Sequence, residues 1–235
     1  MGIRRGEITT KIVSDGLVFN IDPANRASYP RTGTSVENTI FSSTGTMSAT
    51  GMFDTSNQDT FAFDGAGDNI DFADNSLYDI TDAISVFGWM YVTLDKGTGQ
   101  NQYLLSKQNL YDIFITHDLK VAFYAKNISQ PATYSLSAIS INNWFYVGGT
   151  YDKDAGSNNT KVYINGVLSQ EQTRTGAMGS DNNPVRIGSY SNSGGGGNSG
   201  WDMNGNIGIT HIYNRALSAE EVLQNYNGLR GRFGL

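Results

Sequence analysis

The sequence predicts an all-β protein, a sandwich of short antiparallel strands with one short C-terminal helix. First, 28 Gly and only 16% charged residues disfavour long helices and favour many strands joined by turns. Second, 38% hydrophobic residues, including 13 Tyr, 11 Phe and 3 Trp, are enough for a sizeable core. Third, β sandwiches of about 250 residues form single domains, so the 235 residues fit one unit.

Residues 1–14 predict an extended arm in front of this domain, because charge, Thr and isolated Ile follow no clear period there. The domain is expected to span residues 15–235 and to open with a short apolar strand at residues 16–21. Residues 24–51 are rich in Ser, Thr, Gly and Asn, which predicts long surface connections with one weak strand.

Residues 85–92 predict a strand in the middle of a sheet. Aromatic residues, Trp89 among them, alternate with Val and Met, so both faces of the strand are apolar and must be covered. We expect the partner sheet on one side and loops on the other. The same reasoning predicts further strands at residues 60–63, 69–72, 103–107, 112–116, 120–125, 144–151, 184–190 and 206–213.

A two-residue hairpin is predicted at Asn165-Gly166, which separates residues 161–164 from residues 167–170. The type I′ turn of such a hairpin needs positive φ at both central positions, and Asn-Gly supplies them.

The helix is predicted after Ser218, where Glu221 completes a capping box, each side chain bonding the backbone amide of the other residue. It is expected to end at Asn227-Gly228. Its apolar stripe should lie against the sandwich and consists of Val222, Leu223 and Tyr226.

Charge and composition exclude several classes of partner. A formal net charge of −6 disfavours nucleic acid, because binding along a phosphate backbone needs clustered Lys and Arg. No stretch approaches the ~20 apolar residues of a membrane-spanning helix, so membrane insertion is not expected. The first residues lack the apolar run of a secretory signal, so we expect any extracellular role to be reached by another route, such as a particle released by lysis. With no Cys, neither disulfides nor thiolate metal sites are available.

Short motifs follow one another in a fixed order from Asp15 to the C-terminus. They are residues 15–18 (Asp-Gly-Leu-Val), 22–25 (Asp-Pro-Ala-Asn), 61–65 (Phe-Ala-Phe-Asp-Gly) with Asp68 and Ile70, 84–89, 144–152, 163–166 (Tyr-Ile-Asn-Gly), 186–188 (Arg-Ile-Gly) and 212–218 (Ile-Tyr-Asn-Arg-Ala-Leu-Ser). In this order they resemble the laminin G-like superfamily of concanavalin A-like jelly rolls. The resemblance implies two antiparallel sheets, one of them concave, and rim loops that in many members bind glycans or proteins, often with one calcium ion.

The arm, the motif at residues 22–25 and the ending at residues 214–227 also resemble laminin G-like proteins encoded by tailed bacteriophages. This resemblance implies a non-enzymatic component of the virion surface, a capsid decoration or fibre protein with lectin-like adhesive capacity. It would be made in the host cytoplasm and bound to other virion proteins through the arm or a sandwich face. Two alternatives are a free glycan-binding lectin-like domain and an accessory domain of a carbohydrate-active enzyme.

Catalysis is not expected, because glycoside hydrolysis usually needs two close carboxylates. No strand carries the Glu-x-Asp-x-x-Glu pattern of laminarinase-like relatives. His117 and His211 lie in no triad-like motif and are expected to be strand residues.

Calcium is a possible cofactor, because the ion takes about six to eight oxygen ligands and loops rich in Asp, Asn and Gly supply them. The candidate ligands are Asp64 and Asp68 on one strand, turn, strand unit, and Asp202 and Asn204 near the end of the chain. The alternative is that Asp64 serves only in turn hydrogen bonds. Family members often carry acidic residues after the position of Ile207, and this chain does not.

Glycan-binding residues are predicted around the Gly-rich segment at residues 191–200, because aromatic rings stack on sugars while amides bond hydroxyl groups. The candidates are Tyr190, Asn192, Asn198 and Trp201. No strand pattern surrounds Trp201 that would bury it. The alternative is that Trp201 closes one end of the core.

Overall fold

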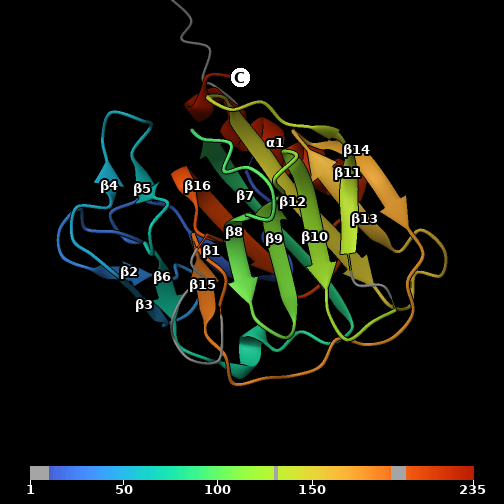
Figure 1. The fold of residues 1–235 in the computed structure, drawn as a ribbon. Coiled ribbons are helices and arrows are strands. Elements are labelled where there is room, and N and C mark those ends of the chain that lie inside the picture. The colour runs from blue at the N-terminus through green and yellow to red at the C-terminus, as the bar shows by residue number, and fades with distance from the viewer. Residues whose placement is uncertain (1–10, 130–131, 192–199) are drawn as a thin grey trace, which may run out of the picture.

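The computed structural model describes residues 11–129, 132–191 and 200–235 and confirms the predicted jelly-roll sandwich of two antiparallel sheets (Figure 1). Sheet A has the strand order β14-β13-β12-β7-β16-β5-β4, and β1 also pairs with β16. Its strands are β1 (Leu17–Ile21), β4 (Phe53–Asp54), β5 (Thr60–Asp64), β7 (Ala83–Val92), β12 (Trp144–Asp152), β13 (Thr160–Ile164), β14 (Val167–Gln172) and β16 (Asn204–Tyr213).

Sheet B, whose strands β8 to β10 lie in front in Figure 1, has the order β11-β10-β9-β8-β15-β6-β3-β2. Its strands are β2 (Ser35–Glu37), β3 (Thr44–Met47), β6 (Ile70–Phe72), β8 (Gln102–Lys107), β9 (Tyr111–Ile115), β10 (Lys120–Ala125), β11 (Ala132–Ala138) and β15 (Val185–Ile187).

Residues 24–51 therefore hold two short strands where one was expected. β11 was not predicted, because its alternation is reversed: Thr133 and Ser135 are buried, whereas Tyr134 and Leu136 are exposed.

The main core fills the space between the two sheets, and Val86 of β7 and Phe123 of β10 are among its buried residues. The sheets approach closely at Gly149 of β12, where an added Cβ would lie 2.3 Å from Cγ of Phe123. Only glycine permits this spacing, and the close contact preserves the dense packing that a sandwich core needs.

β7 is central in sheet A, as predicted, but loops do not cover its outer face. Trp89 stacks on Phe233 with the ring centroids 4.1 Å apart, and on Tyr226 at 5.8 Å. These partners belong to helix α1 (Ala219–Leu229) and the 3₁₀-helix η2 (Arg230–Phe233). A second hydrophobic cluster, separate from the main core, therefore lies between sheet A and the C-terminal segment.

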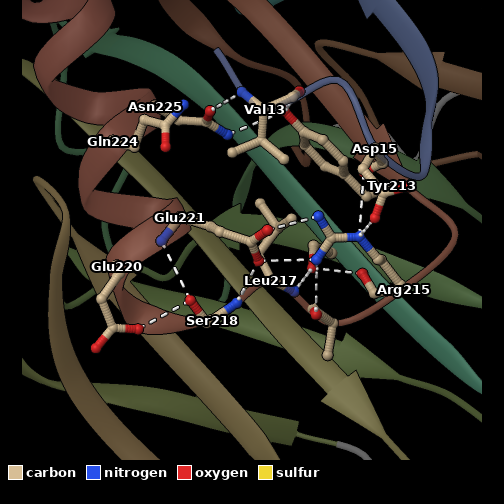
Figure 2. Close-up of polar contacts among 12 residues, drawn as sticks. Val13, Asp15, Tyr213, Arg215, Leu217, Ser218, Glu220, Glu221, Gln224 and Asn225 are labelled. Atoms are coloured by element: carbon tan, nitrogen blue, oxygen red, sulfur yellow. Dashed lines mark hydrogen bonds and ion pairs between the residues drawn. The ribbon is translucent and has the colours of Figure 1, made fainter. Parts of the chain in front are cut away.

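The capping box of α1 is confirmed (Figure 2). The Ser218 hydroxyl accepts the amide of Glu221 at 3.3 Å, and the Ser218 amide donates to the Glu221 carboxylate at 2.9 Å. The helix does not end at Asn227-Gly228 but runs to Leu229, and the left-handed glycine that closes the segment is Gly234.

The predicted stripe of α1 is partly wrong, because Leu223 is 42% exposed while Asn225 is buried. Asn225 accepts the amide of Val13 at 2.8 Å and donates to the Tyr213 hydroxyl at 2.9 Å (Figure 2). The side-chain amide of Gln224 also donates to the Lys11 carbonyl. Lys11 and Val13, which the sequence assigned to the arm, thus contact α1, and the Val13 carbonyl also accepts the Tyr213 hydroxyl of β16 at 3.0 Å.

The Asn165-Gly166 hairpin is confirmed, with φ of 51° and 79° at the two residues. The outer end of this hairpin reaches α1, since an added Cβ on Gly166 would lie 3.0 Å from Leu223. No helix in the described part of the chain is long and apolar enough to cross a membrane.

A second 3₁₀-helix, η1 (Ser76–Tyr78), follows β6. The side chain of Asn75 caps it by accepting the amide of Leu77 at 3.0 Å.

Candidate functional site

The outer face of sheet B carries aromatic side chains that none of the helices in the described residues covers. Tyr103 of β8 lies opposite Phe114 of β9, Phe114 opposite Ala122 of β10, and Ala122 opposite Tyr134 of β11. Tyr124 of β10 lies next to these paired residues, so that aromatic rings follow one another across the sheet. We call the following residues the aromatic row: Trp201, Tyr190, Tyr103, Phe114, Tyr124 and Tyr134.

Consecutive rings of the aromatic row are in contact. Tyr103 stacks on Trp201 at a centroid distance of 6.0 Å and on Phe114 at 4.7 Å. Tyr124 meets Phe114 edge-on at 5.1 Å and Tyr134 at 6.3 Å, and the two Tyr hydroxyls are hydrogen-bonded at 2.8 Å. These contacts fix the ring orientations, because offset-stacked and edge-to-face pairs are the favoured aromatic geometries.

The structure brings together two of the predicted glycan-binding residues, Tyr190 and Trp201, whose rings meet edge-on at 5.3 Å. The indole N–H of Trp201 donates to the Gly99 carbonyl at 3.1 Å, so its position is fixed by the loop between β7 and β8. Trp201 does not close the core between the sheets but belongs to a small cluster on the outer face of sheet B. Asn192 and Asn198 lie outside the described residues.

Beside the aromatic row runs a row of polar side chains, which we call the polar row: Asp71, Arg186, Ser106, Asp112 and Lys126. Arg186 of β15 lies opposite both Asp71 and Ser106, and Ser106 lies opposite Asp112. Arg186 holds Asp71 through two hydrogen bonds of 2.6 and 2.7 Å. Asp112 accepts from the Ser106 hydroxyl at 2.7 Å and lies 2.6 Å from the Lys126 ammonium.

The polar row balances its own charge, since it contains two carboxylates and two cations. Burial raises the pKa of Asp112, and the ammonium of Lys126 and the hydroxyl of Ser106 act against that rise. Lys126 also lies over the ring of Tyr190, 5.1 Å from its centroid, and so joins the two rows.

Two adjoining cavities lie along the aromatic row, with volumes of about 390 and 320 Å³, and the smaller one also reaches Asp112 and Lys126 of the polar row. Both are lined by Asn101, Phe114 and Tyr124, so they form one continuous groove. The larger cavity extends to Tyr134 and the smaller one to Trp201. Together they are within the size range of small-molecule sites.

Sequence reasoning missed four members of the aromatic row, namely Tyr103, Phe114, Tyr124 and Tyr134. A signal was present in β9, where Asp112 and Phe114 alternate with the buried core residues Ile113 and Ile115. An aromatic residue and a carboxylate on one face of a strand do not fit a core, and they indicate that this face of β9 is the outer face of its sheet.

The four predicted calcium ligands come together where β5 pairs with β16, and Asn204 lies opposite Asp64. Protein groups already bond them. The carboxylate of Asp202 accepts from the Ser189 hydroxyl at 2.7 Å, that of Asp68 from the Asp64 amide at 3.1 Å, and that of Asp64 from the Ala66 amide at 2.8 Å. The bond from Ala66 is the turn interaction that was the alternative for Asp64.

A lysine also lies at this cluster. The Lys96 ammonium donates to the carbonyls of Gly65 at 3.1 Å and Asp202 at 2.9 Å. Burial lowers the pKa of Lys96, while the charges of Asp202 and Asp64 act to raise it. A cationic side chain bonded to these oxygens does not fit a calcium ion at the same place, because calcium binds through oxygen donors such as these.

The histidines differ from each other. His117 lies exposed in the turn after β9, so its predicted strand position is wrong, whereas His211 is a buried residue of β16 as expected. The described Glu residues lie away from the groove: Glu37 is on β2, Glu171 on β14, and Glu220 and Glu221 in α1.

Comparisons with known proteins agree with this fold. A laminin G family model, described as the concanavalin A-like lectin/glucanases superfamily, matches residues 64–223. No curated protein sequence matches the chain.

Among solved structures, Trypanosoma rangeli sialidase, in complex with a difluorinated keto-deoxy-nononic acid, superposes with a TM-score of 0.64 at 14% identity, over 92% of this chain and 33% of the sialidase chain. The botulinum neurotoxin serotype D/C binding domain superposes with a TM-score of 0.62 at 14% identity, over 91% of this chain and 52% of that chain.

Botulinum neurotoxin type C, which depends on two ganglioside molecules to enter cells, superposes with a TM-score of 0.61 at 13% identity, over 91% of this chain and 51% of that chain. The chain therefore spans a third of the sialidase and half of the toxin chains. At these identities the likeness shows the fold alone. Since the family model covers more than half of the sequence and the two-sheet architecture agrees with it, the chain belongs to the concanavalin A-like lectin/glucanase superfamily.

Proposed function

We propose that this protein is a non-enzymatic glycan-binding module and that the groove on the outer face of sheet B is its binding site. The observation that carries the proposal is one continuous groove that is lined by the whole aromatic row and, at Asp112 and Lys126, by the polar row. Ring faces provide an apolar platform for the C–H face of a sugar. Asp112 and Lys126, which line the groove, provide an acceptor and a donor that fix the orientation of hydroxyl groups.

The charge of the groove favours a neutral glycan. The two carboxylates that line it, Asp112 and Asp118, are paired with the ammonium groups of Lys126 at 2.6 Å and Lys120 at 3.5 Å, so the groove carries no excess charge toward a ligand. Single-stranded nucleic acid also stacks on aromatic rings, but its grooves are strongly positive. The formal net charge of −6 of this chain argues against that alternative.

The fold comparisons support the proposal, because the similar structures include a sialidase in complex with sialic acid and a neurotoxin that interacts with gangliosides. The chain spans only part of those proteins, so their own sugars do not indicate which sugar this chain binds.

The test is a glycan array followed by titration of the captured glycan with purified variants. Trp201→Ala removes one end of the aromatic row and Tyr124→Ala its middle, and each should weaken binding about tenfold or more. Ile40→Ala is the matched control, because Ile40 is 43% exposed in the loop between β2 and β3. Failure to capture any glycan, or an unchanged affinity in both aromatic variants, would reject the groove as the site.

We also propose that the module binds without hydrolysing. Asp71 and Asp112 are the carboxylates of the polar row, and each is held by a cation at 2.6 Å. This arrangement does not provide the free acid and base pair of a glycosidase. Long incubation of a captured glycan with the protein, followed by mass spectrometry, should return the glycan intact. Cleavage that Asp112→Asn abolishes would show an enzyme and contradict this proposal.

The biological setting that we propose is the virion surface, where the module would serve as a capsid decoration or fibre protein bound to other virion proteins. Its support is the sequence resemblance to laminin G-like proteins of tailed phages. Mass spectrometry of purified particles from the source should find the protein at stoichiometric levels. If it is absent there, the free lectin-like domain and the accessory domain of a carbohydrate-active enzyme are the remaining settings.

The arm is the proposed attachment segment. Deleting residues 2–10 leaves the contacts of Lys11 and Val13 with α1 in place, so the melting temperature should not change. Incorporation into particles should fall. Equal occupancy of the truncated protein would show that a sandwich face makes the attachment.

A further inference from the structure

A fully buried lysine ammonium lies among five oxygen atoms at one end of sheet B. Nζ of Lys107 is 2.7 Å from Asp74 Oδ1, 3.1 Å from Asp181 Oδ1 and 3.2 Å from Asp79 Oδ1. It is also 2.8 Å from the carbonyl of Asn183 and 3.5 Å from that of Asp181. An ammonium group has three protons to donate, so five oxygens exceed its hydrogen-bonding capacity and resemble the oxygen shell of a metal cation.

The fold brings these groups together because β15 lies between β6 and β8. Lys107 ends β8, Asp74 and Asp79 flank η1 after β6, and Asp181 precedes β15. Asp181 is held in place independently of the lysine, because its carboxylate accepts the amides of Asn109 and Asn183, each at 3.0 Å. The oxygens of the three carboxylates come within 4.8 Å of one another, a spacing at which they could hold a metal ion.

The Lys96 cluster repeats this arrangement at the predicted calcium site. There the ammonium bonds two backbone carbonyls, and the carboxylates of Asp64 and Asp202 lie close enough to influence its pKa. The two lysines differ in the direction of their net pKa shift. Burial lowers the pKa of both, but for Lys107 the hydrogen bonds with Asp74 and Asp181 outweigh burial and raise the pKa above its ordinary value.

We propose that this domain carries its own cations, with the ammonium groups of Lys107 and Lys96 in the places where a divalent ion would neutralise the oxygen clusters. The fold and its ligand binding are then independent of calcium, in contrast to what the laminin G-like resemblance implies. Removing the buried Lys107 ammonium leaves carboxylates and carbonyls facing one another without a counter-charge, which is strongly unfavourable. Removing the half-buried Lys96 ammonium costs less. The same removal creates a vacant oxygen cluster for calcium.

The test uses melting temperatures of the full-length chain in chelator and in excess CaCl₂. The unmodified protein should melt at the same temperature in both. Lys107→Met, which keeps the length of the side chain but removes its charge, should melt lower in chelator and regain about 3 °C or more in CaCl₂. Lys107→Met with Asp181→Asn should lose that regain. Lys153→Met is the matched control, because Lys153 lies at the surface beside Asp154, and it should show neither effect.

Lys96→Met is the second variant, in case Lys107→Met does not fold. Lys96 is only half-buried, so its loss should be tolerated and should again confer a rise in melting temperature with CaCl₂. A fall in the melting temperature of the unmodified protein in chelator would overturn the proposal. So would the absence of a calcium response in every folded lysine variant.

Discussion

The two outer faces of the sandwich are both aromatic, but within residues 11–129, 132–191 and 200–235 helices cover only that of sheet A. On sheet A, Trp89 lies under Phe233 and Tyr226 and is fully buried. On sheet B, Tyr124 is half-buried and Tyr134 is 41% exposed, and the rings line a groove. The cover of sheet A comes from the C-terminal end of the chain, more than a hundred residues away from β7. Aromatic residues on the outer face of a sheet therefore indicate that this face needs a partner, and the partner can be the chain itself or a ligand.

Trp89→Ala should have the largest effect on stability. It removes the ring that connects β7 to α1 and η2, and truncation of a buried Trp costs about 3–5 kcal/mol. The melting temperature should fall by about 10 °C. Thermal unfolding checks this, and binding of glycan by the folded fraction should be unchanged. A loss below about 1 kcal/mol would show that the cover of sheet A contributes little to the fold.

Acid should weaken the covered face through His211. Burial lowers the pKa of this imidazole to about 3, and in the described residues neither ring nitrogen has a hydrogen-bond partner. Its unfolded pKa is about 6.5, so between pH 6.5 and 3 the unfolded chain binds a proton that the folded protein does not. Stability is therefore lost as the pH falls, by about 1.4 kcal/mol per pH unit from this group.

His211→Phe keeps the ring and removes the titration. Denaturant unfolding at pH 7 and pH 4.5 should show a loss about 2.7 kcal/mol smaller in the variant than in the unmodified protein. An equal loss in both proteins would mean that the imidazole is solvated.

Gly166→Val tests the contact between the hairpin and the cover of sheet A. At φ of 79° a β-branched residue is strained, and its Cβ would lie 3.0 Å from Leu223 of α1. We expect a loss of about 2 kcal/mol. Gly156→Val is the matched control, because Gly156 has φ of 78° with open space around it. If both variants lose equally, backbone strain alone accounts for the effect.

Tyr134→Ala should have the smallest effect on stability, about 0.5 kcal/mol or less, because its ring is largely exposed on the uncovered face. Binding of the captured glycan should nevertheless weaken. A large drop in melting temperature would instead assign Tyr134 to the fold.

The sequence was sufficient for the parts of the fold that local patterns encode. The β10 strand, the Asn165-Gly166 hairpin and the Ser218 capping box each depend on neighbouring residues, and all three were predicted. The cover of Trp89 depends on residues that are distant in the chain, so loops were expected where α1 and η2 lie.

The site was predicted only around the Gly-rich segment, where Trp201 falls outside any strand pattern and Tyr190 ends the strand predicted at residues 184–190. Phe114 shares a strand face with Asp112, which indicates an outer face, but its place beside Tyr103 follows only from the register between β8 and β9. The lysines were missed for a similar reason. Lys107 reaches its oxygen shell only because β15 is inserted between β6 and β8, which no local pattern shows.

The position of Val13 determines how the domain would be oriented on an assembly to which its N-terminal arm is attached. The Val13 backbone is hydrogen-bonded to Asn225 of α1 and to Tyr213 of β16, so the chain reaches the sandwich on the side of sheet A (Figure 2). The groove is on the opposite side. A copy tethered to a large assembly by residues ahead of Lys11 would turn its covered side toward the support and its aromatic row toward the surroundings. Many such copies would present their grooves in parallel, and weak individual contacts with a glycan-coated surface would then add up to strong multivalent adhesion.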